Sequence, residues 1–255
     1  MGLFSFFQNK EKELSKRIDL GYQTEFHNHL LPNIDDGVES VEESIQIINI
    51  LHGLGINRII TTPHIMSDFY KNTPQNIGDK LELVQKSIQD QNISVVLEAA
   101  AEYYLDEGFI EMLNKNKPFL FFGDGYVLFE TSYMNESPFL TKVIFDLKNA
   151  GYKPILAHPE RYTYFRGNMK MYESVYEKGI YFQLNMNSLT GYYAPEVKKI
   201  AEKLIDAEMV DFIGTDCHGM KHVPIITKAI TMPYYEKLLQ LNILNDKIPL
   251  TSHRK

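Results

Sequence analysis

Apolar runs and amphipathic stretches alternate along the whole chain. Seven short runs rich in β-branched and aromatic residues predict buried strands; they span 21–26, 57–62, 93–100, 126–130, 153–157, 180–184 and 210–215. After the first run, Val41, Ile45 and Ile48 recur at steps of four and three, which places them on one face of a helix. Further helical patterns occupy about 75–91, 106–116, 137–150, 169–178, 195–208 and 234–245. This alternation predicts a parallel sheet covered by helices.

Polar residues mark the ends of the predicted strands. They are His27, His29, His64, Glu102, Glu130, His158, Asn185, Asp216 and His218. In a closed barrel the loops after all the strands converge on one centre, whereas an open doubly wound sheet gathers its ligands at one switch point. The spread of these residues over all the strand ends therefore favours an α/β barrel of seven strands. No linker or repeat divides the chain, so we expect one domain at 21–255 after an N-terminal arm at 1–20.

Composition limits the classes of partner. The chain has 255 residues and a formal net charge of −7; because nucleic-acid affinity comes mainly from Lys and Arg, we expect no nucleic-acid partner. The single cysteine, Cys217, excludes an intramolecular disulfide and agrees with a cytoplasmic location. No apolar run approaches the roughly 20 residues that span a bilayer, so we expect no stable membrane insertion. The sequence does not predict the oligomeric state.

The segment 25–37 carries the densest candidate chemistry. His27 and His29 are two positions apart, so on a strand both imidazoles project to one side and reach one ion. Asp35 and Asp36 follow in a turn closed by a glycine. The alternative interpretation of these two aspartates is a turn with solvated carboxylates.

Many imidazoles and carboxylates at one mouth are costly to bury unless cations neutralise them. Each residue alone is compatible with a structural role, but together they predict a site for two or three divalent ions. Imidazole and carboxylate ligands without thiolate suit Mn, Fe, Zn or Ni, and a multinuclear site serves phosphoester hydrolysis. Thiol-based phosphatase chemistry is excluded, because it needs an arginine six places after the cysteine and Val223 stands six places after Cys217.

The combination of motifs resembles one family. It consists of His-x-His, Asp-Asp-Gly, Thr-x-Pro-His, a Glu after the third and after the fourth strand, His-Pro-Glu-Arg-Tyr and Asp-x-His, within about 22–245. This set resembles the polymerase and histidinol phosphatase (PHP) superfamily. Within that superfamily it is most similar to the bacterial capsular or exopolysaccharide protein-tyrosine phosphatases, which depend on manganese. The resemblance implies the PHP fold, a distorted TIM-like barrel of seven strands, around three divalent metal ions, with Mn²⁺ the expected metal.

The resemblance also implies a ligand for each metal ion. The implied ligands are His27, His29 and Asp216 for the first ion, Glu102 as a bridge to the second, Glu130 and His158 for the second, and Asp36, His64 and His218 for the third.

Further catalytic roles follow from the same resemblance. Arg161 would bind the phosphate with its planar fork, and the alternative is a surface ion pair with Glu160. A general acid in the region of Asp36 or His218 would assist the leaving group. Where the family has a second arginine, this chain has Lys221 and His222, and whether either replaces that charge stays open. Tyrosines near the predicted mouth offer an apolar wall for a tyrosyl ring; they are Tyr103, Tyr104, Tyr133, Tyr162, Tyr164, Tyr192 and Tyr193.

The implied activity is one-step hydrolysis of phosphotyrosine by a metal-bridging hydroxide, with no phosphoenzyme. The implied partner is a phosphotyrosine protein, a bacterial tyrosine kinase that regulates capsular or exopolysaccharide synthesis. Three alternatives stay open at this point. They are a histidinol-phosphate phosphatase, a nuclease or nucleotide phosphoesterase of the same superfamily, and a non-catalytic scaffold with a structural metal.

Overall fold

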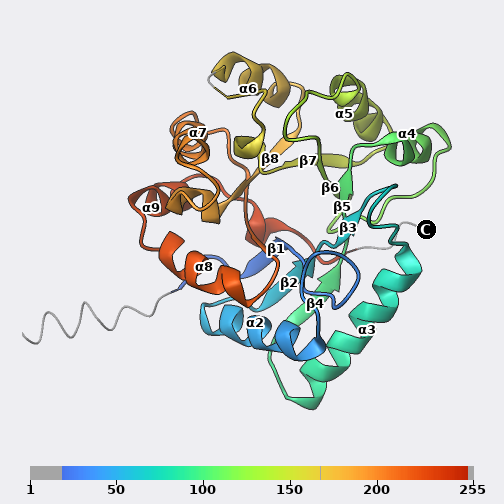
Figure 1. Cartoon of the computed structure of the whole chain (residues 1–255), viewed down its shortest axis with the longest axis vertical. Coiled ribbons are helices and arrows are strands. Elements are labelled where there is room, and N and C mark those ends of the chain that lie inside the picture. Colours follow the sequence, from blue (N-terminus) through green and yellow to red (C-terminus); the bar gives the residue numbers. More distant parts are fainter. Residues whose placement is uncertain (1–18, 167, 252–255) are drawn as a thin grey trace, which may run out of the picture.

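Parallel strands surrounded by helices form the body of the protein in the computed structural model, which describes residues 19–166 and 168–251 (Figure 1). The strands are β1 (Thr24–Asn28), β2 (Arg58–Thr61), β3 (His64–Ile65), β4 (Val96–Ala99), β5 (Glu102–Tyr104), β6 (Tyr126–Glu130), β7 (Lys153–Ala157), β8 (Tyr181–Asn185) and β9 (Phe212–Cys217). They pair in parallel in the order β3-β5-β6-β7-β8-β9-β1-β2-β4.

Two of the seven predicted strands, 57–62 and 93–100, are each followed after a short break by a second strand that was not predicted, and the pairing of these short strands closes the barrel. Strand β2 continues into β3 after Thr62 and Pro63, and β4 continues into β5 after two alanines. The register is the same on both sides of the break, because Thr61 faces Ala99 and His64 faces Glu102. The two ends of the strand order are thus joined by the chain itself. The prediction of an α/β, distorted seven-stranded barrel is confirmed.

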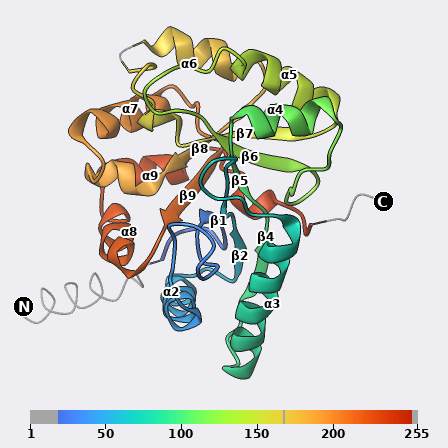
Figure 2. The same cartoon turned by 45° about the vertical axis from the view of Figure 1, so that its right-hand side comes forward.

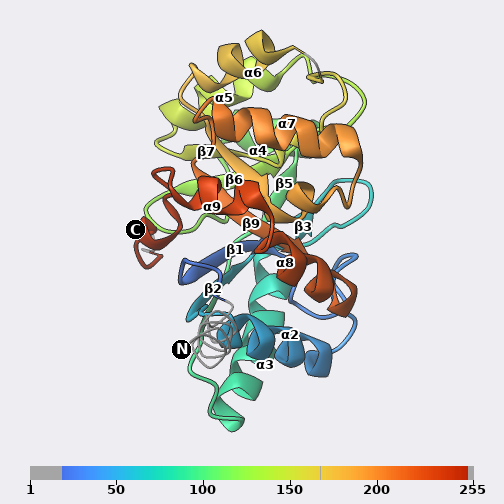
Figure 3. The same cartoon turned by 90° about the vertical axis from the view of Figure 1, so that its left-hand side faces the viewer.

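Helices form the outer layer, and Figures 2 and 3 show them outside the strands from two further sides. They are α2 (Val41–Gly53), α3 (Pro74–Asp90), α4 (Glu107–Asn114), α5 (Leu140–Asn149), α6 (Met169–Tyr176), α7 (Pro195–Asp206), α8 (Val223–Ala229) and α9 (Pro233–Leu239). Four 3₁₀ turns are also described, η1 (Pro159–Arg161), η2 (Met186–Thr190), η3 (Met220–His222) and η4 (Asn245–Lys247). The last predicted helix was too long, since α9 ends at Leu239, and the short α8 was not predicted.

The interior of the barrel is apolar at the end where the strands begin, which we call the lower end; the upper end is the one where the strands finish. One buried cluster alternates along the strands with residues that face the helices, as the two-residue period of a strand requires; its members are Phe26, Ile60, Ala100, Phe122, Tyr126, Leu128, Ile155, Ala157, Phe212 and Ile248. Turn η4 lies against the starts of β1 and β9: Asn245 donates to the carbonyls of Thr24 and Ile213. Polar side chains therefore concentrate at the opposite, carboxyl ends of the strands.

The start of the described chain packs on the barrel. Leu20 is buried, and its N–H donates to the carbonyl of Leu54 at 2.9 Å. The predicted arm at 1–20 lies, up to residue 18, outside the described residues. Among the described helices, none is long and apolar enough to cross a membrane.

Candidate metal centre

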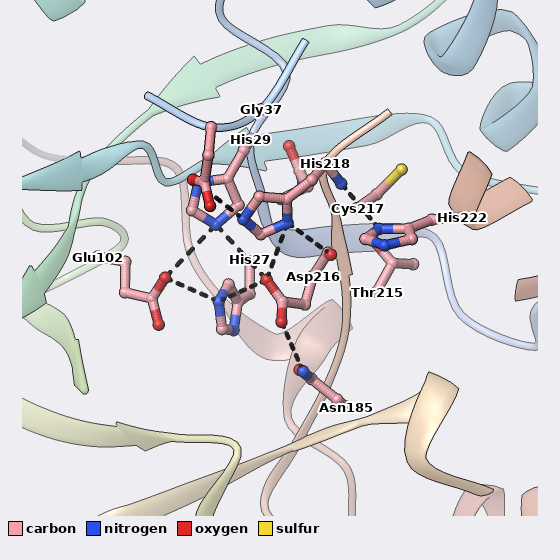
Figure 4. A network of polar contacts seen from close by, with 12 residues as sticks. His27, His29, Gly37, Glu102, Asn185, Thr215, Asp216, Cys217, His218 and His222 are labelled. Carbon is pink, nitrogen blue, oxygen red and sulfur yellow. Dashed lines mark hydrogen bonds and ion pairs between the residues drawn. The ribbon is translucent and has the colours of Figure 1, made fainter. Parts of the chain in front are cut away.

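An irregular pairing of β1 with β9 directs the first two histidines at one point. His27 has a φ of 67°, and the pairing of β1 with β9 shifts register there, from Phe26 opposite Gly214 to Asn28 opposite Cys217. Strand β1 ends just before His29. The Nε2 atoms of His27 and His29 lie 3.1 Å and 3.4 Å from the same oxygen of Glu102 (Figure 4). The two imidazoles meet as expected, but through a distorted strand rather than a regular pleat.

The Asp-Asp-Gly turn is part of the centre. Asp35 accepts hydrogen bonds from His29 Nδ1 at 2.8 Å and from the backbone N–H of His64 at 3.0 Å. A Cβ on Gly37 would collide with the backbone carbonyl and Cβ of His29, so only glycine fits there. Sequence reasoning chose Asp36 as a ligand and gave Asp35 no role. Asp35 holds His29 with Nε2 directed at the other candidate ligands.

All nine predicted metal ligands come together at the carboxyl ends of the strands. Three groups have ligand atoms within 4.8 Å of one another: His27, His29, Glu102 and Asp216; His64, Glu102 and Glu130; and His29, Asp36, His64 and His218. His158 Nε2 lies 3.2 Å from Glu102 and 3.7 Å from Glu130. His29, His64 and Glu102 each belong to two groups, so the division of these ligands among ions stays a prediction.

The donor atoms of this cluster fit divalent cations. Six side-chain atoms of the nine residues are buried without a hydrogen-bond partner. Five of them face other ligands, namely His27 Nε2, His29 Nε2, His64 Nδ1 and both carboxylate oxygens of Glu102, and the sixth is His158 Nδ1. A buried polar atom left unpaired costs about 1–3 kcal/mol. A bound cation would satisfy all five of the atoms that face one another, because each could coordinate it through a lone pair. Nitrogen and oxygen donors without sulfur suit Mn, Fe, Zn or Ni.

The pKa values of the cluster reflect the crowding of acids and histidines. Burial alone lowers the pKa of His27, but the carboxylates of Glu102 and Asp216 outweigh it and raise the pKa to about 9. Burial and the negative charge of Glu102 hold the pKa of Glu130 well above its usual value. A divalent cation counteracts both shifts, because it favours the neutral imidazole and the charged carboxylate as ligands.

A cavity of about 750 Å³ opens onto the cluster, and Arg161 lies in its wall. The guanidinium carbon of Arg161 is 4.6 Å from the ring centre of Tyr133 and 4.2 Å from that of Tyr193. Its Nη1 donates to Asp216 Oδ2 at 2.9 Å. The alternative of a surface ion pair with Glu160 is wrong, because Glu160 is buried and accepts hydrogen bonds from β8 and η2.

Other predicted residues divide between this cavity and the rest of the barrel. Tyr133, Tyr192 and Tyr193 line the cavity, and so do Lys221 and His222. His222 is held by the backbone N–H of His218 and by the hydroxyl of Tyr192, whereas Lys221 is exposed. The remaining tyrosines do not line it; they are Tyr103, Tyr104, Tyr162 and Tyr164. Cys217 is buried and also lies outside the cavity lining.

Several known proteins are similar to this chain. CapC of Staphylococcus aureus is 28% identical over 236 residues, which cover 90% of this chain and 92% of CapC. The tyrosine-protein phosphatase YwqE of Bacillus subtilis is 28% identical over 198 residues, 77% of this chain and 78% of YwqE. A crystal structure from a study of YwqE and of CpsB from Streptococcus pneumoniae, described as metal-dependent tyrosine phosphatases, has 25% identity and a TM-score of 0.76, covering 89% of this chain and 98% of the other.

The fold itself is more widespread. The lactonase Lmo2620 of Listeria monocytogenes is 12% identical and has a TM-score of 0.55, with 94% of this chain and 97% of the lactonase covered. A likeness at this level concerns the barrel alone, and the chemistry depends on the residues at its mouth. Residues 23–240 match the family described as capsular polysaccharide synthesis, CpsB/CapC, and the chain therefore belongs to that family.

Proposed function

We propose that this protein is a metal-dependent protein-tyrosine phosphatase. The observation that carries the proposal is the convergence of nine acids and histidines, many with unpaired donor atoms, beside an arginine in one open cavity. Family membership and the tyrosine phosphatases among the relatives support the same activity. A scaffold without catalysis would not need an exposed cavity over the full set of ligands.

Three divalent ions, Mn²⁺ above all, are the proposed cofactors. Their proposed ligands are His27, His29, Asp216 and Glu102 for the first ion, Glu102, Glu130 and His158 for the second, and Asp36, His64 and His218 for the third. Bound ions supply an activated water at neutral pH and neutralise phosphoryl oxygens.

The protein's own residues position the substrate. Arg161 binds the phosphoryl oxygens, because its guanidinium is held between two tyrosine rings and keeps further N–H groups beyond the one that bonds Asp216. The tyrosyl ring of the substrate packs among the tyrosines that line the cavity. Lys221, exposed at the cavity wall, supplies the second positive charge, since His222 is engaged by its neighbours.

The proposed site of proton transfer to the leaving group is the solvent-exposed side of the ligand cluster. Asp36 is the least buried of the nine ligands, and His218 lies 3.5 Å from it. The proposed general acid lies in the region of these two residues. The demand on it is modest, because a phenol has a pKa of about 10 and leaves as phenolate without full protonation.

The proposed substrate is a phosphotyrosine protein in the cytoplasm, a tyrosine kinase that regulates capsular or exopolysaccharide synthesis. Two observations favour a protein. The cavity has a volume of about 750 Å³, and its wall carries aromatic side chains, including the exposed Phe69 and Tyr192. The family description names capsular polysaccharide synthesis.

Elemental analysis combined with three substrates tests the proposal. We expect Mn²⁺-loaded protein to hydrolyse a phosphotyrosine peptide, with histidinol phosphate and single-stranded DNA much poorer substrates. His29→Ala and Glu102→Ala should each abolish turnover, whereas His52→Ala, at an exposed histidine outside the cluster, should not. Preference for histidinol phosphate, or less than one metal ion per chain with no activity, would refute the proposal.

A further inference from the structure

Strand β8 supplies none of the proposed ligands, yet it carries two buried amides at the centre. It lies between β7, which precedes His158, and β9, which contains Asp216. Gln183 and Asn185 are both fully buried and two positions apart, so they share one face of the strand. A buried amide is costly unless its donors and acceptors are paired. The partners of these two amides therefore indicate why they are there.

The carbonyl oxygen of Gln183 accepts two hydrogen bonds from the metal-binding segments. One comes from Nδ1 of His27 at 2.6 Å, the other from the backbone N–H of His158 at 3.2 Å. A backbone N–H only donates, so the atom facing it is the amide oxygen and not the amide nitrogen. An oxygen in turn accepts only, so Nδ1 of His27 carries the proton. Nε2 of His27 faces Glu102 and Asp216, whose oxygens are 3.1 Å and 3.4 Å away, and with the proton on Nδ1 the lone pair of Nε2 is free for a cation held with these carboxylates.

The same network reaches Asp216. The amide nitrogen of Gln183 donates to Asn185 Oδ1 at 2.9 Å. Asn185 Nδ2 in turn donates to Asp216 Oδ2 at 2.7 Å, a contact that Figure 4 shows. Arg161 occupies the same carboxylate oxygen. The other oxygen, Oδ1, faces His27, 3.4 Å away. One chain of hydrogen bonds thus orients both His27 and Asp216 through atoms that do not face the proposed metal ion.

The space for this network is built into the barrel. A Cβ on Gly214 would lie 2.6 Å from the amide nitrogen of Gln183 and 3.0 Å from the Cβ of His27, so no larger residue fits there. His27 and Asp216 both have positive φ angles, a strained conformation that persists only where neighbouring contacts fix it. Gln183 and Asn185 supply such contacts.

We propose that Gln183 is a positioning residue that holds His27 as the Nδ1-protonated tautomer and, through Asn185, orients Asp216, so that the first metal site is preformed. This inference rests on the metal-binding part of the proposed function and not on the identity of the substrate. Partners of this kind behind metal ligands contribute about 10- to 100-fold in metal affinity.

Metal affinity is the first test. Gln183→Leu keeps the size of the side chain and removes both polar partners, and we expect Mn²⁺ to bind the full chain about 10- to 100-fold more weakly in titrations against a competing chelator. Gln183→Glu retains an acceptor for His27 Nδ1 and should recover part of the loss. Gln85→Leu, at a helix glutamine that bonds the carbonyl of Leu97, is the matched control and should bind Mn²⁺ normally. Unchanged affinity in a folded Gln183→Leu protein would overturn the proposal.

A second measurement needs no variant and so does not depend on folding of a mutant. In the Zn²⁺-loaded wild-type chain, long-range ¹H–¹⁵N spectra of histidine should show His27 protonated at Nδ1 and metal-bound at Nε2. Binding through Nδ1, or a proton on Nε2, would overturn the proposal. Both measurements stand apart from phosphatase activity, so failure of the proposed function would not be mistaken for failure of this inference.

Discussion

At the scale of single residues, three proposed ligands have an unusual backbone. His27, His158 and Asp216 have φ angles of 67°, 33° and 48°. Residues with a Cβ avoid this region, and such strain costs about 1–3 kcal/mol for each residue. Regular strand geometry would direct alternate side chains to opposite faces, whereas these distortions turn the ligands toward one centre. The barrel therefore carries local strain at the positions that make the site.

Arg161 offers a direct test of phosphate binding. We predict that Arg161→Ala lowers kcat/KM for a phosphotyrosine peptide about 100-fold, because a fixed donor facing the developing negative charge is lost. Metal content should stay normal, since Asn185 still bonds Asp216. Steady-state kinetics and elemental analysis measure the two effects, with Arg166→Ala at an exposed site as control. Equal kinetics for both variants would remove Arg161 from the site.

Cys217 tests whether a thiol takes part. Its side chain is fully buried, donates weakly to the carbonyl of Gly219 at 3.6 Å, and does not line the cavity. We predict that Cys217→Ser retains turnover within about threefold. The serine hydroxyl can repeat the contact to Gly219, and the residues that line the cavity are unchanged. A fall of several orders of magnitude at normal metal content would return the thiol to the mechanism.

At the scale of elements, the sequence predicted the strands better than their interruptions. Apolar runs located all seven strands, but β3 and β5 have only two and three residues, too few for a period to be visible. Pro63 is the one local signal, because proline cannot donate to a sheet. The breaks matter for the site. His64 is the first residue of β3 and Glu102 is the first residue of β5, and the two are paired across these short strands.

The supporting hydrogen bonds were harder to predict than the ligands. Ligand types and spacing are visible in the motifs; eight of the nine residues meet in the three groups, and His158 lies beside Glu102. Asp35, Gln183 and Asn185 act through contacts between segments far apart in the chain, such as Gln183 with His27. In the sequence, Asn185 stands out only as a polar residue at a strand end, and Gln183 lies inside an apolar run with no motif. Such contacts depend on register and bulges, which a single sequence does not reveal.

The lower end of the barrel depends on one asparagine. Asn245 in η4 is fully buried, accepts from the N–H of Ile213 and donates to the carbonyls of Thr24 and Ile213. We predict that Asn245→Ala lowers the free energy of unfolding by about 2–4 kcal/mol, because backbone groups of β1 and β9 lose their partners. Urea unfolding measures this change. Asn242→Ala, exposed nearby, should cost less than about 0.5 kcal/mol, and equal effects would contradict the role of η4.

At the scale of the whole molecule, the apolar lower half and the polar upper half of the barrel do different work. Residues from five strands fill the lower interior, while the candidate ligands at the upper end have six buried side-chain atoms without a hydrogen-bond partner. The free-energy cost of buried, unpaired polar atoms is therefore concentrated at the cavity, where binding of cations offsets it. Stability and metal binding are therefore linked through the whole barrel.

This linkage predicts that chelation destabilises the protein. Any ligand that binds only the folded state stabilises it, by about 2.7 kcal/mol for one site at a free concentration 100 times its dissociation constant. For a chain of this size we expect the Tm to fall by roughly 5–10 °C in excess EDTA. Activity should be lost in parallel, and added Mn²⁺ should restore both. Glu102→Ala, which removes one of the three residues shared by two ligand groups, should show a much smaller Mn²⁺-dependent shift. If wild-type protein melted at the same temperature with and without chelator, the cations would not be part of its folded state, and the interpretation of the unpaired donor atoms would be wrong.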